Sequence, residues 1–144
     1  MKLTWASEYA ILGMLHLSRV PVGKNVLLAS ISEKEDIPES FLRKIFGTLA
    51  KSGLLRSHRG PQGGFSLLRP PEQISLRQIV EAVEGPIAFT ECILGPNICS
   101  RQGRCPIEVH CQDIHQRMVE IMDQTSVADI ANNKGNKSRV AGKS

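Results

Sequence analysis

The chain has 144 residues, of which 41% are hydrophobic and only 4% aromatic, so we expect one domain, or a small domain plus an oligomerisation segment, with an aliphatic helical core. No window approaches the ~18 continuous apolar residues of a membrane span, and Ser7 and Glu8 interrupt any signal peptide. We therefore predict a cytoplasmic protein whose thiols stay reduced. The formal net charge is +4, but four of the eighteen basic residues and no acid lie in the last thirteen residues.

The distribution of charge is more informative than its sum. Residues 1–131 have as many acidic as basic side chains, and we predict that residues 131–144, which are rich in Asn, Gly, Lys and Ser, form a disordered basic tail. Residues 40–69, in contrast, contain no acid and six basic side chains, namely Arg43, Lys44, Lys51, Arg56, Arg59 and Arg69. This stretch predicts a positive surface patch of the kind that a polyanion needs.

The first half of the chain has the pattern of a helix-turn-helix. Apolar spacing predicts helices over residues 4–18, with Thr4 as a cap, over 26–34 and over 39–51. Pro38 stands near the start of the third helix, and Gly53 fits a left-handed residue at its end. Two short helices joined by a tight turn, of which the second is basic, are typical of DNA-binding helix-turn-helix units.

A hairpin pattern follows in LLRSHRGPQGGFSLLR, where apolar residues flank a tip of Gly and Pro. A helix-turn-helix followed by such a hairpin is a winged helix, so the predicted fold class is mainly α with a small β-wing. A solvated surface hairpin is the alternative interpretation. We expect DNA contact because the wing coincides with the acid-free stretch.

Two more helices are predicted after the wing. Ser75 caps a helix that ends at Gly85, and an amphipathic helix spans about residues 107–124. This amphipathic helix either folds back on the first helix or buries its apolar stripe in a partner subunit. We favour burial in a partner subunit. The predicted division is a winged domain (1–85), a cysteine loop (86–106), a dimerisation helix with a C-terminal segment (107–130) and the tail.

All four cysteines lie in the loop and the start of the next helix, with the spacing C-x6-C-x5-C-x5-C. Reduced surroundings disfavour disulfides, and structural zinc usually takes cysteine pairs spaced C-x2–4-C, which this chain lacks. Looser loops can surround an iron–sulfur cluster. Four unrelated free thiols remain a further alternative.

The segments MKLTWASEYAILGMLHL and LAKSGLLRSHRGPQGGF, together with the cysteine block, carry a family likeness. Over about residues 1–130 the chain resembles the Rrf2 family of iron–sulfur cluster-binding winged-helix regulators, which includes IscR-, NsrR- and RirA-like proteins. The resemblance implies a homodimer with a long crossed dimerisation helix, and a cluster held by three cysteines. We expect [4Fe–4S] rather than [2Fe–2S].

The resemblance also implies the ligands. Cys92, Cys99 and Cys105 match the three-cysteine pattern, whereas Cys111 falls where many members carry tryptophan and is a spare thiol or an alternative ligand. Some members place a histidine three residues after the third cysteine. This chain has Glu108 there, and the nearest histidine, His110, is a weak alternative. In other members an acidic residue of the partner subunit's first helix binds the cluster, and the matching residue, Glu8, is our first choice for the fourth ligand.

These expectations predict a transcriptional regulator, and more specifically a repressor that senses redox state, nitric oxide or iron and cluster status. The rival hypotheses are a cluster-free thiol or zinc regulator and a cluster carrier or electron-transfer protein. We do not expect an enzyme, because no nucleophile–base pair or phosphate-binding loop is evident. The predicted contacts to promoter DNA are Ser40, Phe41, Arg43 and Lys44 in the recognition helix and His58, Arg59 and Gln62 in the wing.

Overall fold

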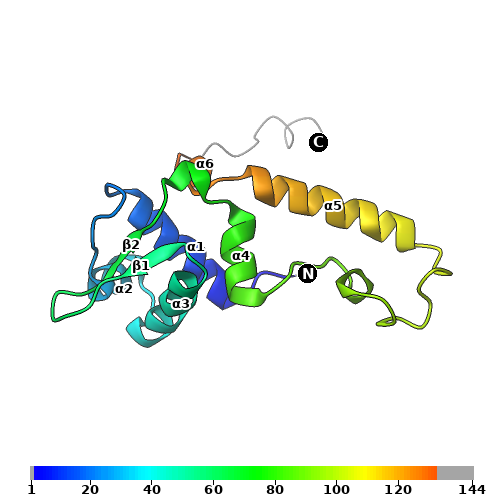
Figure 1. The fold of residues 1–144 in the computed structure, drawn as a ribbon, viewed down its shortest axis with the longest axis horizontal. Helices are drawn as coiled ribbons and strands as arrows, with labels where there is room; N and C mark the ends of the chain where they lie inside the picture. Colours follow the sequence, from blue (N-terminus) through cyan, green and yellow to red (C-terminus); the bar gives the residue numbers. More distant parts are fainter. Residues whose placement is uncertain (1, 133–144) are drawn as a thin grey trace.

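A computed structural model describes residues 2–132, so residues 133–144 of the predicted tail lie outside the described part. The chain is mainly helical with one small antiparallel sheet, which confirms the predicted fold class (Figure 1). Its elements in order are α1 (Trp5–Ser18), α2 (Leu28–Glu35), α3 (Glu39–Lys51), β1 (Leu55–Ser57), β2 (Phe65–Leu67), a 3₁₀ turn (Pro71–Gln73), α4 (Leu76–Glu84), a second 3₁₀ turn (Glu91–Leu94), α5 (Glu108–Gln124) and α6 (Val127–Ala131).

The predicted end signals operate as expected. The Thr4 hydroxyl accepts a hydrogen bond from the Ser7 amide at the start of α1. Ser75 forms a capping box with Gln78 at the start of α4, and Gly53 adopts a φ of 78° after α3. The hydrogen bonds to Thr4 and Ser75 satisfy amides that a helix start otherwise leaves unpaired, so they fix where α1 and α4 begin.

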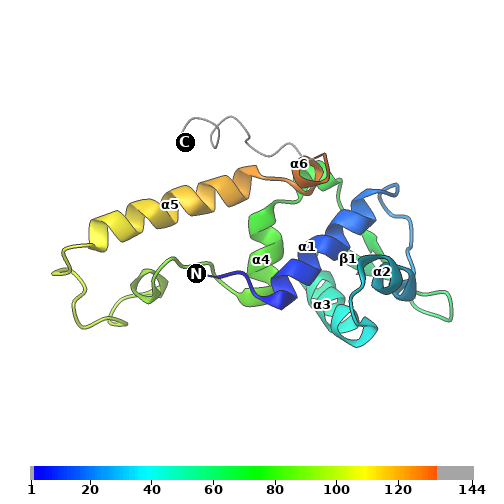
Figure 2. The ribbon, with the colours of Figure 1, turned by 180° about the vertical axis from the view of Figure 1, so that it is seen from behind.

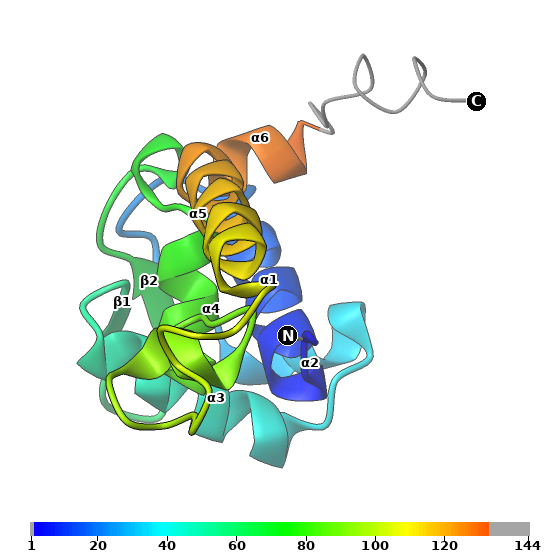
Figure 3. The same ribbon diagram turned by 90° about the vertical axis from the view of Figure 1, so that its right-hand side faces the viewer.

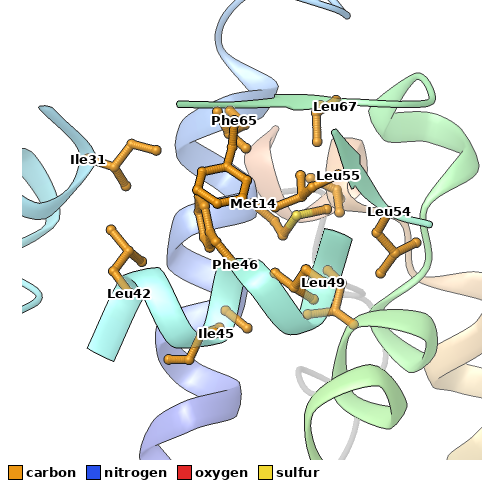
Figure 4. Close-up of a cluster of buried hydrophobic side chains, with 14 of the residues drawn as sticks. Met14, Ile31, Leu42, Ile45, Phe46, Leu49, Leu54, Leu55, Phe65 and Leu67 are labelled. Atoms are coloured by element: carbon orange, nitrogen blue, oxygen red, sulfur yellow. The ribbon is translucent and has the colours of Figure 1, made fainter. Parts of the chain in front are cut away.

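The core lies where α1, α3 and the sheet meet (Figure 4). Phe46 of α3 is completely buried, and its ring meets the edge of the Phe65 ring with centroids 5.2 Å apart. Met14 of α1 is also fully buried in this cluster. Because α3 is buried along one face, its opposite face is exposed to solvent and can contact a ligand.

The wing is tied to the segment before α2, which the sequence analysis assigned wrongly to that helix. Val26 forms a bridge with Phe65 through hydrogen bonds of 2.9 and 3.0 Å, so α2 begins only at Leu28. Gly64 makes this possible, since a Cβ there would stand 2.0 Å from the Val26 carbonyl oxygen. The wing therefore starts from a fixed base beside the helix-turn-helix.

The α5 helix extends away from the other helices, and residues 86–106 connect its far end back to α4 (Figures 1 and 2). Only its C-terminal part packs on the winged domain, where Met118 and Met122 join Val80 of α4 in a second apolar cluster. Figure 3 views α5 nearly end-on from its far end. The N-terminal part of the helix thus projects with the cysteine loop.

The short helix α6 was not predicted. It follows a bridge between Ser75 and Ser126, where the Leu76 amide donates to the Thr125 carbonyl and the Val127 amide to the Ile74 carbonyl, both at 2.8 Å. Among the helices of residues 2–132, none is both long and apolar enough to cross a membrane.

Candidate nucleic-acid interface and thiol loop

The exposed face of α3 carries the predicted recognition residues. Leu42, Phe46 and Leu49 are buried, and at about 100° per residue Ser40 and Lys44 lie on the opposite side. Ser40, Phe41, Arg43 and Lys44 are all exposed. A polar, basic ridge that points away from the core is the arrangement by which a helix enters the major groove.

Arg43 has a partner that the sequence analysis did not anticipate. Its guanidinium donates to the Glu39 carboxylate, one helical turn earlier, at 2.9 Å. Both residues line a hollow that the first turn of α2 and the wing residues His58 and Gly64 complete. The hollow brings the recognition helix and the wing to one surface, and Glu39 is the acid that a DNA phosphate would meet there.

The wing residues are held to different degrees. The His58 Nε2 atom lies 2.8 Å from the hydroxyl of Ser66, which is buried. The Gln62 carbonyl accepts a hydrogen bond of 2.8 Å from the Asn25 side chain, whereas Arg59 is exposed at the tip. The backbone of the wing is therefore anchored while its arginine remains available for phosphate or groove contact.

The four cysteines are free thiols and form no disulfide. Cys92, Cys99 and Cys105 are partly exposed in the loop, whereas Cys111, in the first turn of α5, is buried. Within residues 2–132, no three histidine, cysteine, aspartate or glutamate side chains come together as a group that could hold a metal ion. The donor chemistry suits an iron–sulfur cluster, but the thiols of this single chain are not gathered around one point.

Within residues 2–132, the other predicted ligands, Glu8 and His110, form no metal-holding group with the thiols. Glu8 is exposed on the first turns of α1, and His110 is exposed on α5. Glu108, at the position where the resemblance implied a histidine ligand, accepts a hydrogen bond of 2.7 Å from the Gly103 amide. Glu108 therefore shapes the turn that precedes α5 instead of standing free.

Several residues that the sequence analysis passed over hold the start of the loop. The Phe89 amide donates to His115 Nδ1 of α5 at 3.4 Å, and the Thr90 hydroxyl lies 3.1 Å from the Cys92 sulfur. Just before the loop, Glu84 accepts hydrogen bonds from Thr4 and Ser7 at the start of α1. No periodic pattern marks such residues, because His115 and Glu84 act through partners far along the chain and Thr90 acts through a single side-chain contact.

Known proteins share this architecture and much of this sequence. The family model described as Rrf2, iron-dependent transcriptional regulator, matches residues 3–133. The IscR transcriptional regulator of Erwinia tasmaniensis is 32% identical over 134 residues, which cover 93% of this chain and 81% of the relative. The IscR regulator of Aliivibrio salmonicida is 33% identical over 130 residues, covering 90% and 77%.

Solved structures agree with the fold. CymR, the global cysteine regulator of Bacillus subtilis, superimposes with a TM-score of 0.76 at 24% identity and covers 92% of this chain and 98% of that one. IscR of T. potens gives a TM-score of 0.70 at 24% identity, with 95% and 90% covered. A family model that spans almost the whole chain, relatives above 30% identity and this shared architecture lead to one assignment. The chain belongs to the Rrf2 family of winged-helix transcriptional regulators.

Proposed function

We propose that this protein is a homodimeric repressor that binds promoter DNA in the cytoplasm and holds an iron–sulfur cluster, [4Fe–4S] in preference to [2Fe–2S], whose loss or conversion releases the DNA. The signal would be redox state, nitric oxide or iron status. In this proposal residues 1–85 bind DNA, 86–106 hold the cluster, and 107–130 form the dimer. Three partly exposed free thiols within one loop of a DNA-binding family member carry the proposal.

Exposed basic residues support the proposed DNA-binding surface. The ridge of α3 and the wing tip border one hollow that Arg43 lines, Arg59 is exposed at the wing tip, and Lys44 is exposed on the other side of α3. Guanidinium groups can read guanine with two hydrogen bonds, so Arg43 is suited to base recognition once it leaves Glu39. The wing arginine is suited to phosphate contact.

An unpartnered apolar face supports the proposed homodimer. Ile107, which caps the projecting helix, and Ile114 and Ile121 within it recur every seven residues and are 58%, 46% and 52% exposed. A helix that leaves such a stripe in water is expected to bury it against a second helix. Because a twofold dimer uses the same patch twice, a second copy of α5 is the natural partner.

Cys92, Cys99 and Cys105 would hold the cluster, with Glu8 of the partner subunit as the fourth ligand. A cluster supplies chemistry that responds to oxidants and nitric oxide. A carboxylate is a poorer match than a thiolate for such iron and is exchangeable. The ligands of this chain would bind and orient the group, and Thr90 and His115 would fix the path of the loop that leads to Cys92.

Anaerobic native mass spectrometry of the full chain tests the cluster directly. We expect a dimer with one cluster mass per subunit, and the loss of that mass in Cys99→Ala. Cys111→Ala is the matched control, because Cys111 is a buried thiol of the same segment that the proposal does not use. A wild-type protein purified without oxygen that contains no acid-labile sulfide would refute cluster binding. Glu8→Ala should leave three-thiolate clusters that lose iron faster.

A cluster-free thiol regulator is the second candidate function. The specific observation in its favour is that no metal-binding group is gathered within residues 2–132 while three thiols are partly exposed. Such a protein would be colourless and would change its DNA affinity when a peroxide oxidises the thiols. A visible absorption spectrum of anaerobic protein distinguishes it from a cluster protein.

Selection of bound sequences from random duplexes, followed by Arg43→Ala, tests the DNA-binding surface. We expect the variant to bind its best site about tenfold or more weakly and to lose preference at one base pair. Lys51→Ala is the control. Lys51 lies at the far end of the same helix, so its substitution should change the affinity for all duplex sequences by the same factor. Equal loss on every duplex by Arg43→Ala would mean that Arg43 touches only phosphate.

A further inference from the structure

An apolar groove lies between the first turns of α1, the flank of α3 and the end of α4. Its volume is about 710 Å³, and Ile45 and Val83 contribute aliphatic surface to it. This volume lies within the range of pockets that hold small molecules, roughly 300–1,000 Å³. The groove lies on a different side of α3 from the hollow that contains Arg43 and the wing.

Aromatic side chains gather at this groove although the chain has few of them. Trp5 and Tyr9 are the only residues of their kinds in the sequence, and Phe41 is one of four phenylalanines. The rings of Trp5 and Tyr9 lie 6.0 Å apart at 45° to each other. Trp5 is 73% exposed and Phe41 is 60% exposed, so two large rings face water at its rim. A flat apolar ligand would cover both rings and stack on them.

The charge at the groove is of one sign. Among the residues that the structure describes, 2–132, Lys44 is the only charged one that lines it, and no acid does. Arg43 is paired with Glu39, but Lys44 makes no ion pair with any residue of the described chain, 2–132. A cation at the edge of an apolar, aromatic surface is complementary to a ligand with a single negative charge.

We propose that this groove binds a small aromatic monoanion, such as an aromatic carboxylate. The ring system would lie against Trp5, Tyr9 and Phe41, and the carboxylate would meet the ammonium group of Lys44. The hydroxyl of Thr48, which also lines the groove one turn after Lys44, donates to the Lys44 carbonyl at 3.2 Å and would have to leave this bond to donate to the anion. Neither the thiol loop nor a cluster is needed for this binding.

Ligand and DNA should exclude each other. This consequence rests on the proposed DNA surface, in which Phe41 and Lys44 contact the duplex. A ligand that neutralises Lys44 and covers Phe41 would remove both from DNA, so the groove would couple a metabolite of this class to promoter occupancy.

Fluorine NMR of the full chain labelled with 5-fluorotryptophan tests the proposal, because Trp5 is the sole tryptophan and gives one resonance. The probe is 1-naphthoate, and the neutral compound of similar shape is 1-naphthalenemethanol. We expect 1-naphthoate to shift the resonance in a saturable way and the alcohol to bind several-fold more weakly. Lys44→Met should weaken 1-naphthoate binding about five- to tenfold, and Lys51→Met should leave it unchanged.

Three results would overturn the proposal. The first is that millimolar 1-naphthoate does not shift the resonance, and the second is that the acid and the alcohol bind equally well. The third is that the resonance responds to protein concentration but not to the probe, which would mean that a second copy covers the groove. All three are measured without DNA, and on cluster-free as well as cluster-loaded protein, because the proposed ligand Glu8 lies within one helical turn of Trp5. Failure here therefore leaves the proposed regulator function standing, and failure of that function leaves this test intact.

Discussion

Glu84 stabilises the start of α1 although 80 residues separate it from Thr4. Its carboxylate accepts hydrogen bonds from the Thr4 amide at 3.0 Å, the Thr4 hydroxyl at 2.7 Å and the hydroxyl of Ser7, which is completely buried. A negative charge at a helix N-terminus is favourable. We expect Glu84→Gln to lower the free energy of unfolding by about 1 kcal/mol at pH 7, measured by urea denaturation.

The effect of Glu84 should depend on pH with a definite sign. Burial raises the pKa of Glu84, but the hydrogen bonds from Ser7 and Thr4 outweigh it, so the pKa lies below its ordinary 4.5. A lowered folded pKa means that the stabilisation is complete above the unfolded value and is lost as pH falls through the folded one. The difference between wild type and Glu84→Gln should therefore vanish in acid. Glu72→Gln, at an exposed carboxyl, should show no such difference.

At the scale of elements, the crossing of α1 and α3 depends on a close approach at Gly13. A Cβ there would stand 2.4 Å from the Phe46 ring, and this ring cannot move away easily because it is fully buried against Phe65. We expect Gly13→Ala to destabilise the fold by about 1–3 kcal/mol through overpacking. Thermal and urea unfolding measure the change.

The same substitution on the partner helix should have the opposite sign. Gly47 lies within α3 and has nothing within 4 Å of an added Cβ. Gly47→Ala should raise the free energy of unfolding by up to about 1 kcal/mol, because alanine loses less backbone freedom in a helix. A stabilising Gly13→Ala or a destabilising Gly47→Ala would contradict this account of the crossing.

The helices themselves could be predicted from sequence because their signals are local. Thr4, Ser75 and Gly53 mark ends by bonds within one turn, and apolar spacing marks the buried faces. The pairing of Val26 with the wing and the bridge that starts α6 could not, because each depends on a strand partner far along the chain. The apolar character of Trp5 favours burial, whereas the structure leaves it 73% exposed at the groove.

The candidate site was predictable in composition but not in arrangement. The acid-free stretch indicated a basic surface, and the ridge of α3 has it. The pairing of Arg43 with Glu39 is visible in the sequence only as one of many possible four-residue spacings. The anchoring of Phe89 by His115 joins residues 26 positions apart and had no sequence signal.

At the scale of the whole molecule, the projecting α5 has too little of its own chain to pack on. Its C-terminal part is held to α4 by the second apolar cluster and by the ion pair between Arg77 and Asp123, 2.9 Å long. Its N-terminal part carries the thiol loop without a comparable cluster. The position of the loop relative to the recognition helices would therefore depend on the partner subunit, which ties the proposed sensing to the proposed dimer.

Ile114→Lys tests this dependence, because Ile114 lies in the middle of the exposed stripe. Burying an unpaired ammonium group in an apolar helix pair is costly, so we expect sedimentation to show a monomer at concentrations where the wild type is a dimer. Gln116→Lys adds the same charge about 200° around the helix and should leave the dimer intact. Since two half-sites about 34 Å apart require two linked recognition helices, the Ile114→Lys monomer should also lose tight binding to a palindromic duplex. A dimeric Ile114→Lys protein would place the interface elsewhere, and the stripe would then need another partner.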